Sequence, residues 1–439
     1  MTRNENRISF RVIRGCVFAA LLGLLVIAAI PYGTVEPWWK AAFVCAVFAI
    51  CILAIVEMWV SGSFKVPEGS ILLPLLALSV LAFVQTLSFS SEQVAGLTIR
   101  STISADPFQT RFFALQLLAL TAWLALLYRY ASTERRMRVL VYTILGVAVA
   151  SAVFGILRQA AQHQTGFVLP LLRQGQGYGQ FVNKNHFAYL MEMAFGLGIG
   201  IALAGGIKRD RLLIYVALLL PIWTALVLSN SRGGILAMLV QIISAVLLLG
   251  SRRLTAVRVV LLVVLVAGVL FGTLWVGGDR LASNFENATS ELNTGEANMR
   301  AGVSRNEIWR ATLKMFAAHP ITGVGLGGYW IGITAYHDAS GLMTPQEAHN
   351  DYLELLASGG VVGFAIGVWF LVSVIRAARA NLAIDTGYTR ALRLGAILGI
   401  IGAAAHSLVD FGLHIFVNAI IFLALIMIAS IRSRNAFAV

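Results

Sequence analysis

Histidine side chains that could do chemistry stand where long apolar runs of the sequence begin or end. His349 lies in the polar segment 348–351, directly before an apolar run. A neutral imidazole near physiological pH is suited to take a proton from a hydroxyl group, so His349 is a candidate general base. His337 is the rival candidate for this role, and helix capping or packing is the alternative role for His349.

Two arginines are candidates for binding an anion. Arg158 ends one apolar run, and Arg232 follows residues 229–231 at the end of another. An ionised side chain at such a position is costly unless it meets an anion or lines a wet cavity. Snorkelling towards lipid phosphates is the alternative for both. Because a tight Ser-Arg-Gly-Gly connection leaves little room to snorkel, we favour a functional role for Arg232.

Two further polar groups lie beside apolar runs. The first offers amides, a cation and an imidazole for substrate binding, from Asn183, Lys184, Asn185 and His186. The second has i, i+4, i+8 spacing, which puts its members on one face of a helix: His406, Asp410 and His414. A His/Asp/His metal site is conceivable there. Since Gly412 can break this helix and no further carboxylate cluster is evident, we favour a hydrogen bond between Asp410 and a histidine, and we predict no metal.

Two carboxyl groups fall inside apolar runs. Glu57 and Glu192 are each single, and the sequence names no charged partner for either. A proton relay is one interpretation, because ionisable residues at membrane depth are often functional. We favour structural hydrogen bonding for both.

Composition places all of these residues in a membrane protein. Hydrophobic residues make up 59% of the 439 residues, charged residues make up 12%, and the mean hydropathy is +0.82. A soluble domain of this length would need far more surface charge. Crossing a hydrocarbon core takes roughly 20 helical residues, and an isolated strand in lipid would leave backbone groups unpaired. The predicted fold is therefore all-α, with twelve apolar spans centred near Leu22, Ile50, Ala77, Leu120, Gly146, Leu197, Leu219, Gln241, Leu265, Gly363, Ile397 and Leu423.

The distribution of Lys and Arg predicts the orientation, because these residues stay in cytoplasmic loops during insertion. With the N-terminus inside, most of the 33 basic residues fall in short inside segments, among them 3–14, 129–138, 208–211, 252–258 and 376–393. Both termini are then cytoplasmic, and all 7 histidines lie on the outer side or at the outer ends of helices. The same bias accounts for most of the net charge of +13, so nucleic-acid binding is not expected.

The predicted organisation has three parts. Residues 1–277 hold nine transmembrane helices, 278–351 form one large periplasmic loop, and 352–439 hold three more helices. Within the loop, apolar residues recur at helical spacing from Arg305 onward, which favours a helix lying at the membrane interface. The run GVGLGG at 323–328 superficially resembles a dinucleotide fingerprint, but no strand or βαβ unit surrounds it. We reject nucleotide binding and expect a flexible turn there.

The strongest motif is AHNDYLELLASGGVVG at residues 348–363, where the loop re-enters the membrane. It is accompanied by four further motifs, Arg305-x-x-x-Trp309, His319-Pro320-x-x-Gly323-x-Gly325-x-Gly327, Ser231-Arg232-Gly233-Gly234 and Asn183-x-Asn185-x-Phe187-Ala188. In their order and placement, these motifs resemble the O-antigen ligase family. They span roughly residues 180 to 365, and the hydropathy pattern extends the likeness over nearly the whole chain.

The resemblance implies a membrane-embedded glycosyltransferase of the GT-C-like kind in the bacterial inner membrane, with its active site facing the periplasm. Its donor would be an O-antigen polysaccharide on undecaprenyl diphosphate, and its acceptor a sugar hydroxyl of lipid A-core. The family's essential loop histidine matches His349. Arginines needed for activity match Arg232 by its Ser-Arg-Gly context and Arg305 by its spacing to Trp309, and a late-helix Asp matches Asp410.

This chemistry agrees with the residues themselves. Arginines can stabilise the charge that grows on a departing diphosphate, so no acid is needed for the leaving group. Direct displacement by an acceptor hydroxyl, deprotonated by His349, would invert the anomeric centre without a covalent glycosyl-enzyme. The absence of an outward Asp-x-Asp motif fits a lipid-linked donor and metal-independent catalysis without a cofactor.

Other functions share part of this pattern. An O-antigen polymerase or a protein O-oligosaccharyltransferase would use the same donor and differ in the acceptor. We favour the ligase because the loop is moderate in size. A lipid-glycan transporter or flippase is the alternative of a different class, but it would usually show repeats and functional charges near the membrane midplane. Here the polar residues gather at one face.

Overall fold

The computed structural model describes residues 3–30, 32–64, 70–94, 97–161, 177–249, 263, 267, 305–337 and 345–432. Within these ranges the protein is an all-α, multi-pass membrane protein, which confirms the predicted fold class. Nine of the described helices are long and apolar enough to cross a membrane: α1 (Arg3–Ala29), α2 (Pro37–Ser61), α4 (Pro107–Tyr130), α5 (Glu134–Ala160), α6 (Lys184–Leu203), α7 (Arg209–Leu228), α8 (Arg232–Leu249), α12 (Asp351–Ile384) and α13 (Gly387–His406).

Two shorter apolar helices, α3 (Leu72–Gln85) and α14 (Phe416–Ser430), occupy two more of the predicted spans. Eleven of the twelve predicted centres therefore fall in apolar helices. The twelfth, centred near Leu265, lies outside the described residues. Three short helices are described in the stretch predicted as a loop: α10 (Arg305–Ala318), α11 (Tyr329–Gly332) and the 3-10 helix η2 (Ile333–Ala335). A second 3-10 helix, η3 (Gly412–His414), precedes α14.

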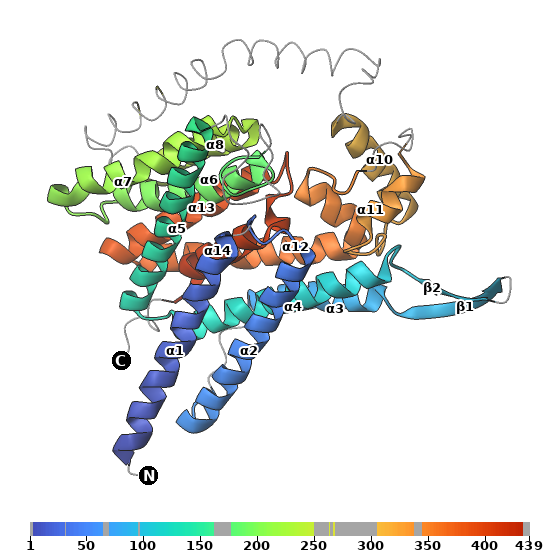
Figure 1. The fold of residues 1–439 in the computed structure, drawn as a ribbon, viewed down its shortest axis with the longest axis horizontal. Helices are drawn as coiled ribbons and strands as arrows, with labels where there is room; N and C mark the ends of the chain where they lie inside the picture. The colour runs from blue at the N-terminus through green and yellow to red at the C-terminus, as the bar shows by residue number, and fades with distance from the viewer. Residues whose placement is uncertain are drawn as a thin grey trace.

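A small β-hairpin, which the sequence analysis did not predict, joins α3 to α4. Strand β1 (Ser88–Val94) pairs antiparallel with β2 (Leu97–Thr102), with Ser91 opposite Arg100. Figure 1 shows the hairpin projecting from the helical body. The β2 segment is rich in β-branched residues, which favour strands, but it is too short to stand out beside the apolar runs.

The centre of the molecule is the pair α6 and α13. All residues of α6 from His186 onward are buried. Glycines let the two backbones approach closely: a Cβ on Gly196 would lie 2.7 Å from the backbone nitrogen of Gly399, and one on Gly200 would lie 2.5 Å from the Cα of Gly395. Small residues four apart are the usual means of close packing between membrane helices. This contact fixes the start of α6 relative to the end of α13.

The glycine-rich segment 323–328 is fastened to α12 by backbone hydrogen bonds. Val324 N donates to Ala357 O at 3.1 Å, and Gly325 N donates to Ser358 O at 3.0 Å. The same part of α12 is kinked at Gly360, whose φ of 62° and ψ of −167° are open only to glycine. Gln85, at the end of α3, links the residue before this segment to α12: its side-chain amide donates to Thr322 O at 2.7 Å and to Ser358 O at 3.0 Å. The predicted flexible turn is thus a packed joint between α3 and α12.

Helix α10 confirms the helix predicted from Arg305 onward, and its apolar face is turned towards protein. Ile308, Ala311, Thr312 and Met315 are buried. Ala311 and Met315 pack in a small cluster with Val324, Tyr329, Ile333, Ala348 and Ala357. The helix therefore holds the segment before α12 in place, and Figure 1 shows α10 and α11 together at one end of the bundle.

Both carboxyl groups of the apolar runs have partners that the sequence could not name. Glu57 accepts hydrogen bonds from Arg129 and from Tyr130, each at 2.8 Å. Glu192 lies 2.9 Å from Nδ1 of His406, and both side chains are fully buried. Arg14 is also near Glu57, at 3.9 Å. Glu57 on α2 therefore links α1, through Arg14, to α4, through Arg129.

Candidate functional site

Asp410, in the turn after α13, is the centre of the candidate site. Its carboxylate is 1% exposed. One oxygen, Oδ2, accepts from the amide of Asn185 and lies 3.3 Å from Nη2 of Arg305. The other, Oδ1, lies 3.3 Å from Nδ1 of His349 and accepts from the backbone of Phe411 at 2.9 Å. Four parts of the chain that are distant in sequence therefore meet here, and we call Asn185, Arg305, His349 and Asp410 the Asp410 cluster.

The Asp410 carboxyl is held in its ionised form. Burial acts to raise its pKa, but the hydrogen bond with His349 and the charges of His186 and Arg305 outweigh burial and place the pKa well below the ordinary range. A carboxylate with hydrogen-bond donors around it keeps its negative charge at any physiological pH. Asp410 is therefore a permanent acceptor for the groups that surround it.

The residues on both sides of His349, Ala348 and Asn350, are held in place by hydrogen bonds. Asn350 caps α12, with its side-chain oxygen accepting from the N–H groups of Tyr352 and Leu353 at 3.0 Å each. On the other side, the indole of Trp309 donates to Ala348 O at 3.0 Å. Between them His349 adopts a φ of 50°, a left-handed conformation that costs a non-glycine residue of order 1–3 kcal/mol. Surrounding contacts thus hold the imidazole in a conformation it would seldom adopt alone.

The orientation of His349 suits a general base. An ionised Asp410 accepts a hydrogen bond from Nδ1–H, so in the neutral imidazole the proton stays on Nδ1 and Nε2 has a free lone pair. The His349 side chain is 31% exposed, so a substrate can reach it. The carboxylate also stabilises the imidazolium that forms when Nε2 takes up a proton.

Arg305 is the exposed cation of the cluster. It begins α10, and its side chain is 46% exposed. A guanidinium group has five N–H donors, so Arg305 can bind Asp410 and still present donors to an anion.

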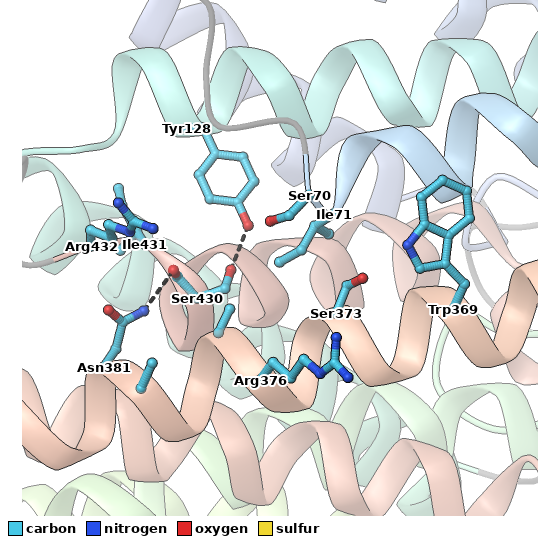
Figure 2. Close-up of a pocket in the computed structure, with 12 residues that line it drawn as sticks. Ser70, Ile71, Tyr128, Trp369, Ser373, Arg376, Asn381, Ser430, Ile431 and Arg432 are labelled. Atoms are coloured by element: carbon cyan, nitrogen blue, oxygen red, sulfur yellow. Dashed lines mark hydrogen bonds between the residues drawn. The ribbon is translucent and has the colours of Figure 1, made fainter.

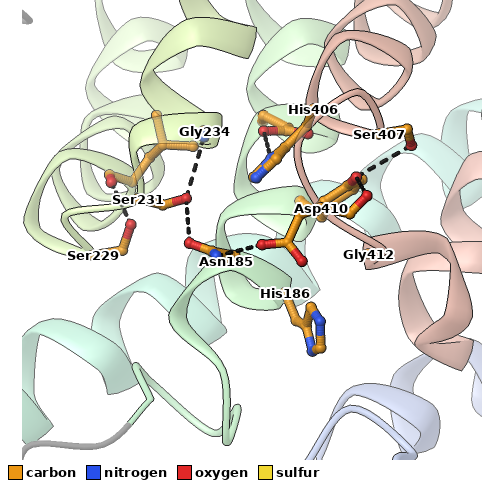
Figure 3. Close-up of polar contacts among 12 residues, drawn as sticks. Asn185, His186, Ser229, Ser231, Gly234, His406, Ser407, Asp410 and Gly412 are labelled. Carbon is orange, nitrogen blue, oxygen red and sulfur yellow. Dashed lines mark hydrogen bonds and ion pairs between the residues drawn. The ribbon is translucent and has the colours of Figure 1, made fainter. Parts of the chain in front are cut away.

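The first turn of α6 connects this cluster to the start of α8. Ser231 donates to the amide oxygen of Asn185 at 2.8 Å, and Asn185 donates in turn to Asp410. Figure 3 shows Ser231, Asn185 and Asp410 joined in a row. Lys184 binds the neighbouring turn through Asn230 O at 2.9 Å. Asn183, by contrast, caps α6 by accepting from the backbone of Asn185 at 2.8 Å, which is a structural role.

Arg232 lies next to this row without a described contact to Asp410. It is exposed and is the first residue of α8, directly after Ser231. Ser231 accepts from the N–H of Gly234 at 3.2 Å and so caps the helix. The N-terminus of a helix carries partial positive charge, which adds to the charge of Arg232 in attracting an anion.

His186 is brought to the cluster but is buried. It is 6% exposed, and its ring meets that of Phe411 edge-on at 4.8 Å. Phe411 also meets His349 at 4.9 Å and His414 at 6.0 Å, so three imidazoles surround one aromatic ring. This position supports packing more than direct contact with a substrate.

Two predicted residues stand apart from the Asp410 cluster in the described contacts. Arg158 ends α5 and donates to Gly179 O at 2.7 Å. His337 follows η2, where its backbone N–H donates to Ile333 O at 3.1 Å. Neither has a described contact with Asp410.

The predicted arrangement of His406, Asp410 and His414 on one helix face is wrong. Helix α13 ends at His406, and a turn separates it from η3. His406 pairs with Glu192, and Asp410 pairs with His349, which the sequence analysis did not name as its partner. A hydrogen bond between Asp410 and a histidine was the favoured interpretation, and the structure has one.

A carboxylate cluster that the sequence analysis missed surrounds His414. Its ring nitrogens lie 3.3 Å from Glu347, 3.6 Å from Asp351 and 3.6 Å from Glu354. Glu347, Asp351 and Glu354 are four and three positions apart in the sequence, a spacing that could have indicated this cluster. Glu347 itself lies before α12, which begins at Asp351. Burial would lower the pKa of His414, but Glu354 and Glu347 raise it to about 10. Burial acts to raise the pKa of Glu347, but His414 lowers it to about 2.

Among the described residues, Glu347, Glu354 and His414 form the one group with metal-ligand geometry. Their ligand atoms lie within 4.8 Å of one another. The carboxylates favour a protonated His414, so a metal ion would have to displace this proton before the ring could bind it. The imidazolium thus supplies the positive charge that the carboxylates require.

Comparison with known proteins gives one family. Residues 214–368 match the family model described as O-antigen ligase. The matched range contains Arg232, Arg305 and His349, whereas Asn185 and Asp410 lie outside it. No curated protein matches the chain.

Proposed function

We propose that this chain transfers an O-antigen polysaccharide from undecaprenyl diphosphate to a sugar hydroxyl of lipid A-core, because residues 214–368 match the O-antigen ligase family model. The family supports a glycosyltransferase activity of the ligase or polymerase type. We place the reaction at the periplasmic face of a bacterial inner membrane, in a GT-C-like enzyme. The observation that carries this proposal is the pairing of His349 with a buried, ionised Asp410 beside the exposed Arg305.

The acceptor is activated by His349. Its Nε2 takes the proton of the acceptor hydroxyl while the hydroxyl oxygen attacks the anomeric carbon of the donor sugar. Asp410 keeps Nδ1 protonated and stabilises the resulting imidazolium. The bond between the anomeric carbon and the diphosphate oxygen breaks as the new glycosidic bond forms, and its electron pair leaves with the diphosphate. A single displacement of this kind inverts the anomeric centre.

The leaving group is stabilised by arginines. Charge grows on the diphosphate as the glycosidic bond breaks, and preorganised cations at that point lower the barrier. Arg305 is exposed and already oriented by Asp410, and Arg232 stands at the positive end of α8. We assign both to the diphosphate, with Lys184, which lies beside Asn230 and the start of α8, as a further donor contact. The reaction requires neither a metal nor a cofactor in this mechanism.

The decisive experiment is reconstitution of the purified protein with an undecaprenyl diphosphate glycan and rough lipopolysaccharide. The acceptor is followed by its shift in electrophoretic mobility. We expect polymer-capped lipopolysaccharide from the unaltered protein and none from His349→Gln. His319→Gln is the matched control, because His319 is exposed and belongs to the same part of the chain.

The other outcomes identify the alternatives. Extension of a lipid-linked glycan in place of lipopolysaccharide would mean a polymerase, and transfer to a protein would mean a protein O-oligosaccharyltransferase. Movement of the donor across a vesicle membrane without covalent transfer would mean a transporter and would refute the enzyme proposal.

A further inference from the structure

A cavity lies at the opposite end of the bundle from the Asp410 cluster. It has a volume of about 480 Å³ and lies among α3, α4, α12 and α14. Helix α14 begins near the Asp410 cluster and reaches the cavity at its other end, and its 15 residues span roughly 22 Å. The lining residues are Ser70, Ile71, Tyr128, Trp369, Ser373, Arg376, Ala377, Ala380, Asn381, Ser430, Ile431 and Arg432. The cavity is therefore distinct from the proposed active site.

The lining has the chemistry of an anion site. It carries two guanidinium groups, from Arg376 and Arg432, and four hydroxyl groups, but no carboxylate. Figure 2 shows hydroxyl groups of Ser70 and Ser373 around the same space as Arg376. Arg376 and Arg432 are exposed. Guanidinium and hydroxyl groups are the donors that bind phosphate oxygens.

The inner wall of the cavity is rigid. Asn381, which is buried, donates to Ser430 O at 2.7 Å. The hydroxyl groups of Tyr128 and Ser430 are hydrogen-bonded to each other. These contacts tie α4, α12 and α14 together at this point. An anion would therefore meet a preformed wall on one side and the long side chains of Arg376 and Arg432 on the other. Because the wall is already ordered, binding costs less conformational entropy.

Apolar side chains continue from the cavity along the membrane-facing surface. On α3 these are Leu73, Leu76 and Val80, and on α12 they are Val368, Leu371 and Ile375, all of them exposed. Trp369, at the rim, is 45% exposed, as is typical of an aromatic residue at the level of lipid headgroups. A ligand with a charged head and apolar chains would match both the cavity and this surface.

We propose that this cavity binds the headgroup of one anionic phospholipid, with its phosphodiester held by Arg376 and Arg432. Its acyl chains would lie along the exposed apolar residues of α3 and α12. Basic pockets between membrane helices are known to take anionic headgroups, and the volume suits a glycerophosphate group. With the predicted orientation the lipid belongs to the cytoplasmic leaflet. The site does not depend on the proposed glycosyltransferase reaction.

The experiment is native mass spectrometry of the full chain, released from micelles that contain phosphatidylglycerol. We expect one phosphatidylglycerol to remain bound to the unaltered protein, and the double variant Arg376→Gln/Arg432→Gln to bind it about tenfold more weakly. The matched control is Arg135→Gln/Arg379→Gln, which removes the same charge at exposed positions outside the cavity and should retain the lipid. Phosphatidylcholine should bind weakly to all three.

A second variant separates loss of binding from loss of folding. Ser373→Leu fills part of the cavity without changing any charge, and it should also weaken lipid retention while the protein elutes as the unaltered chain does. Equal phosphatidylglycerol retention in the arginine double variant and its control would overturn the proposal. Saturable binding of glycerol phosphate in place of the lipid would instead identify a site for a free phosphate compound, and it would also overturn it.

Discussion

Two buried aspartates with arginine partners behave differently in this protein. Asp385 and Arg393 are 2% and 1% exposed, and Arg393 also donates to the carbonyl groups of Ala429 and Ile431. Asp410 is equally buried, but its partners Arg305 and His349 are 46% and 31% exposed. In the first pair the N–H donors of Arg393 bind other protein groups, and the pair joins the end of α12 to the end of α14. The second turns reactive groups outward, and this difference in exposure separates a structural ion pair from a candidate active site.

The largest expected effect is on the outward pair. Replacing His349 by Gln removes the proposed base while keeping a polar side chain of similar length. Transfer in the reconstituted assay should fall about 10²- to 10⁴-fold, mainly in kcat, with no change in Tm. Undiminished turnover would remove His349 from the mechanism.

The inward pair should respond in the opposite way. Asp385→Asn leaves Arg393 buried with its charge uncompensated, which typically costs about 3–5 kcal/mol. We expect a clear fall in the free energy of unfolding, measured by denaturant in detergent, while turnover per folded molecule stays unchanged. A stable Asp385→Asn variant with reduced turnover would reverse the distinction drawn between the two pairs.

Arg305 should show an intermediate effect. Arg305→Gln removes one cation from the proposed diphosphate site, and kcat/KM should fall roughly 10- to 100-fold, since a charge-assisted hydrogen bond is worth about 1.5–3 kcal/mol. Arg310→Gln, on the exposed side of the same helix, is the control and should be near the unaltered rate. The dependence of the transfer rate on the concentration of the lipid-linked glycan donor gives kcat/KM for each variant. Equal losses in the two variants would mean that Arg305 acts only through the general charge of α10.

The carboxylates around His414 predict a stability that depends on pH. Because the folded pKa of His414 is raised to about 10, its contribution is fully present below the unfolded pKa of about 6.5 and is lost as the pH rises towards 10. The unaltered protein should therefore lose Tm over this window, and His414→Gln should lose less. Parallel pH curves for the two proteins would show that His414 is not charged in the folded state.

The smallest expected effect is that of metal removal. Exhaustive chelation should leave transfer activity unchanged, because His349 and the arginines supply the proposed chemistry without a metal. Loss of activity that a divalent cation restores would direct attention to Glu347, Glu354 and His414. That result would refute the metal-independent mechanism.

Parts of the candidate site were accessible from the sequence because they rest on local patterns. His349, Arg305 and Asp410 were each singled out by residue type, motif and position beside an apolar run, and the structure brings all three together. The partners of Glu57 and Glu192 were not accessible, since Arg129 and His406 are brought near only by the packing of separate helices. Ser231, Asn185 and Asp410 were each named from the sequence, but no motif contains all three, so their contacts were not accessible from it.

The amino-acid sequence by itself determined that this chain is a bundle of membrane helices, because long apolar runs in lipid can satisfy their backbone groups only as helices. It also determined which residues had the chemistry for a site. Only the tertiary structure decided how they are used. The ends of α6 and α13 are brought together by glycines, and α12 is turned at Gly360. These contacts join residues 61 to 225 positions apart around Asp410, and no local pattern encodes such separations.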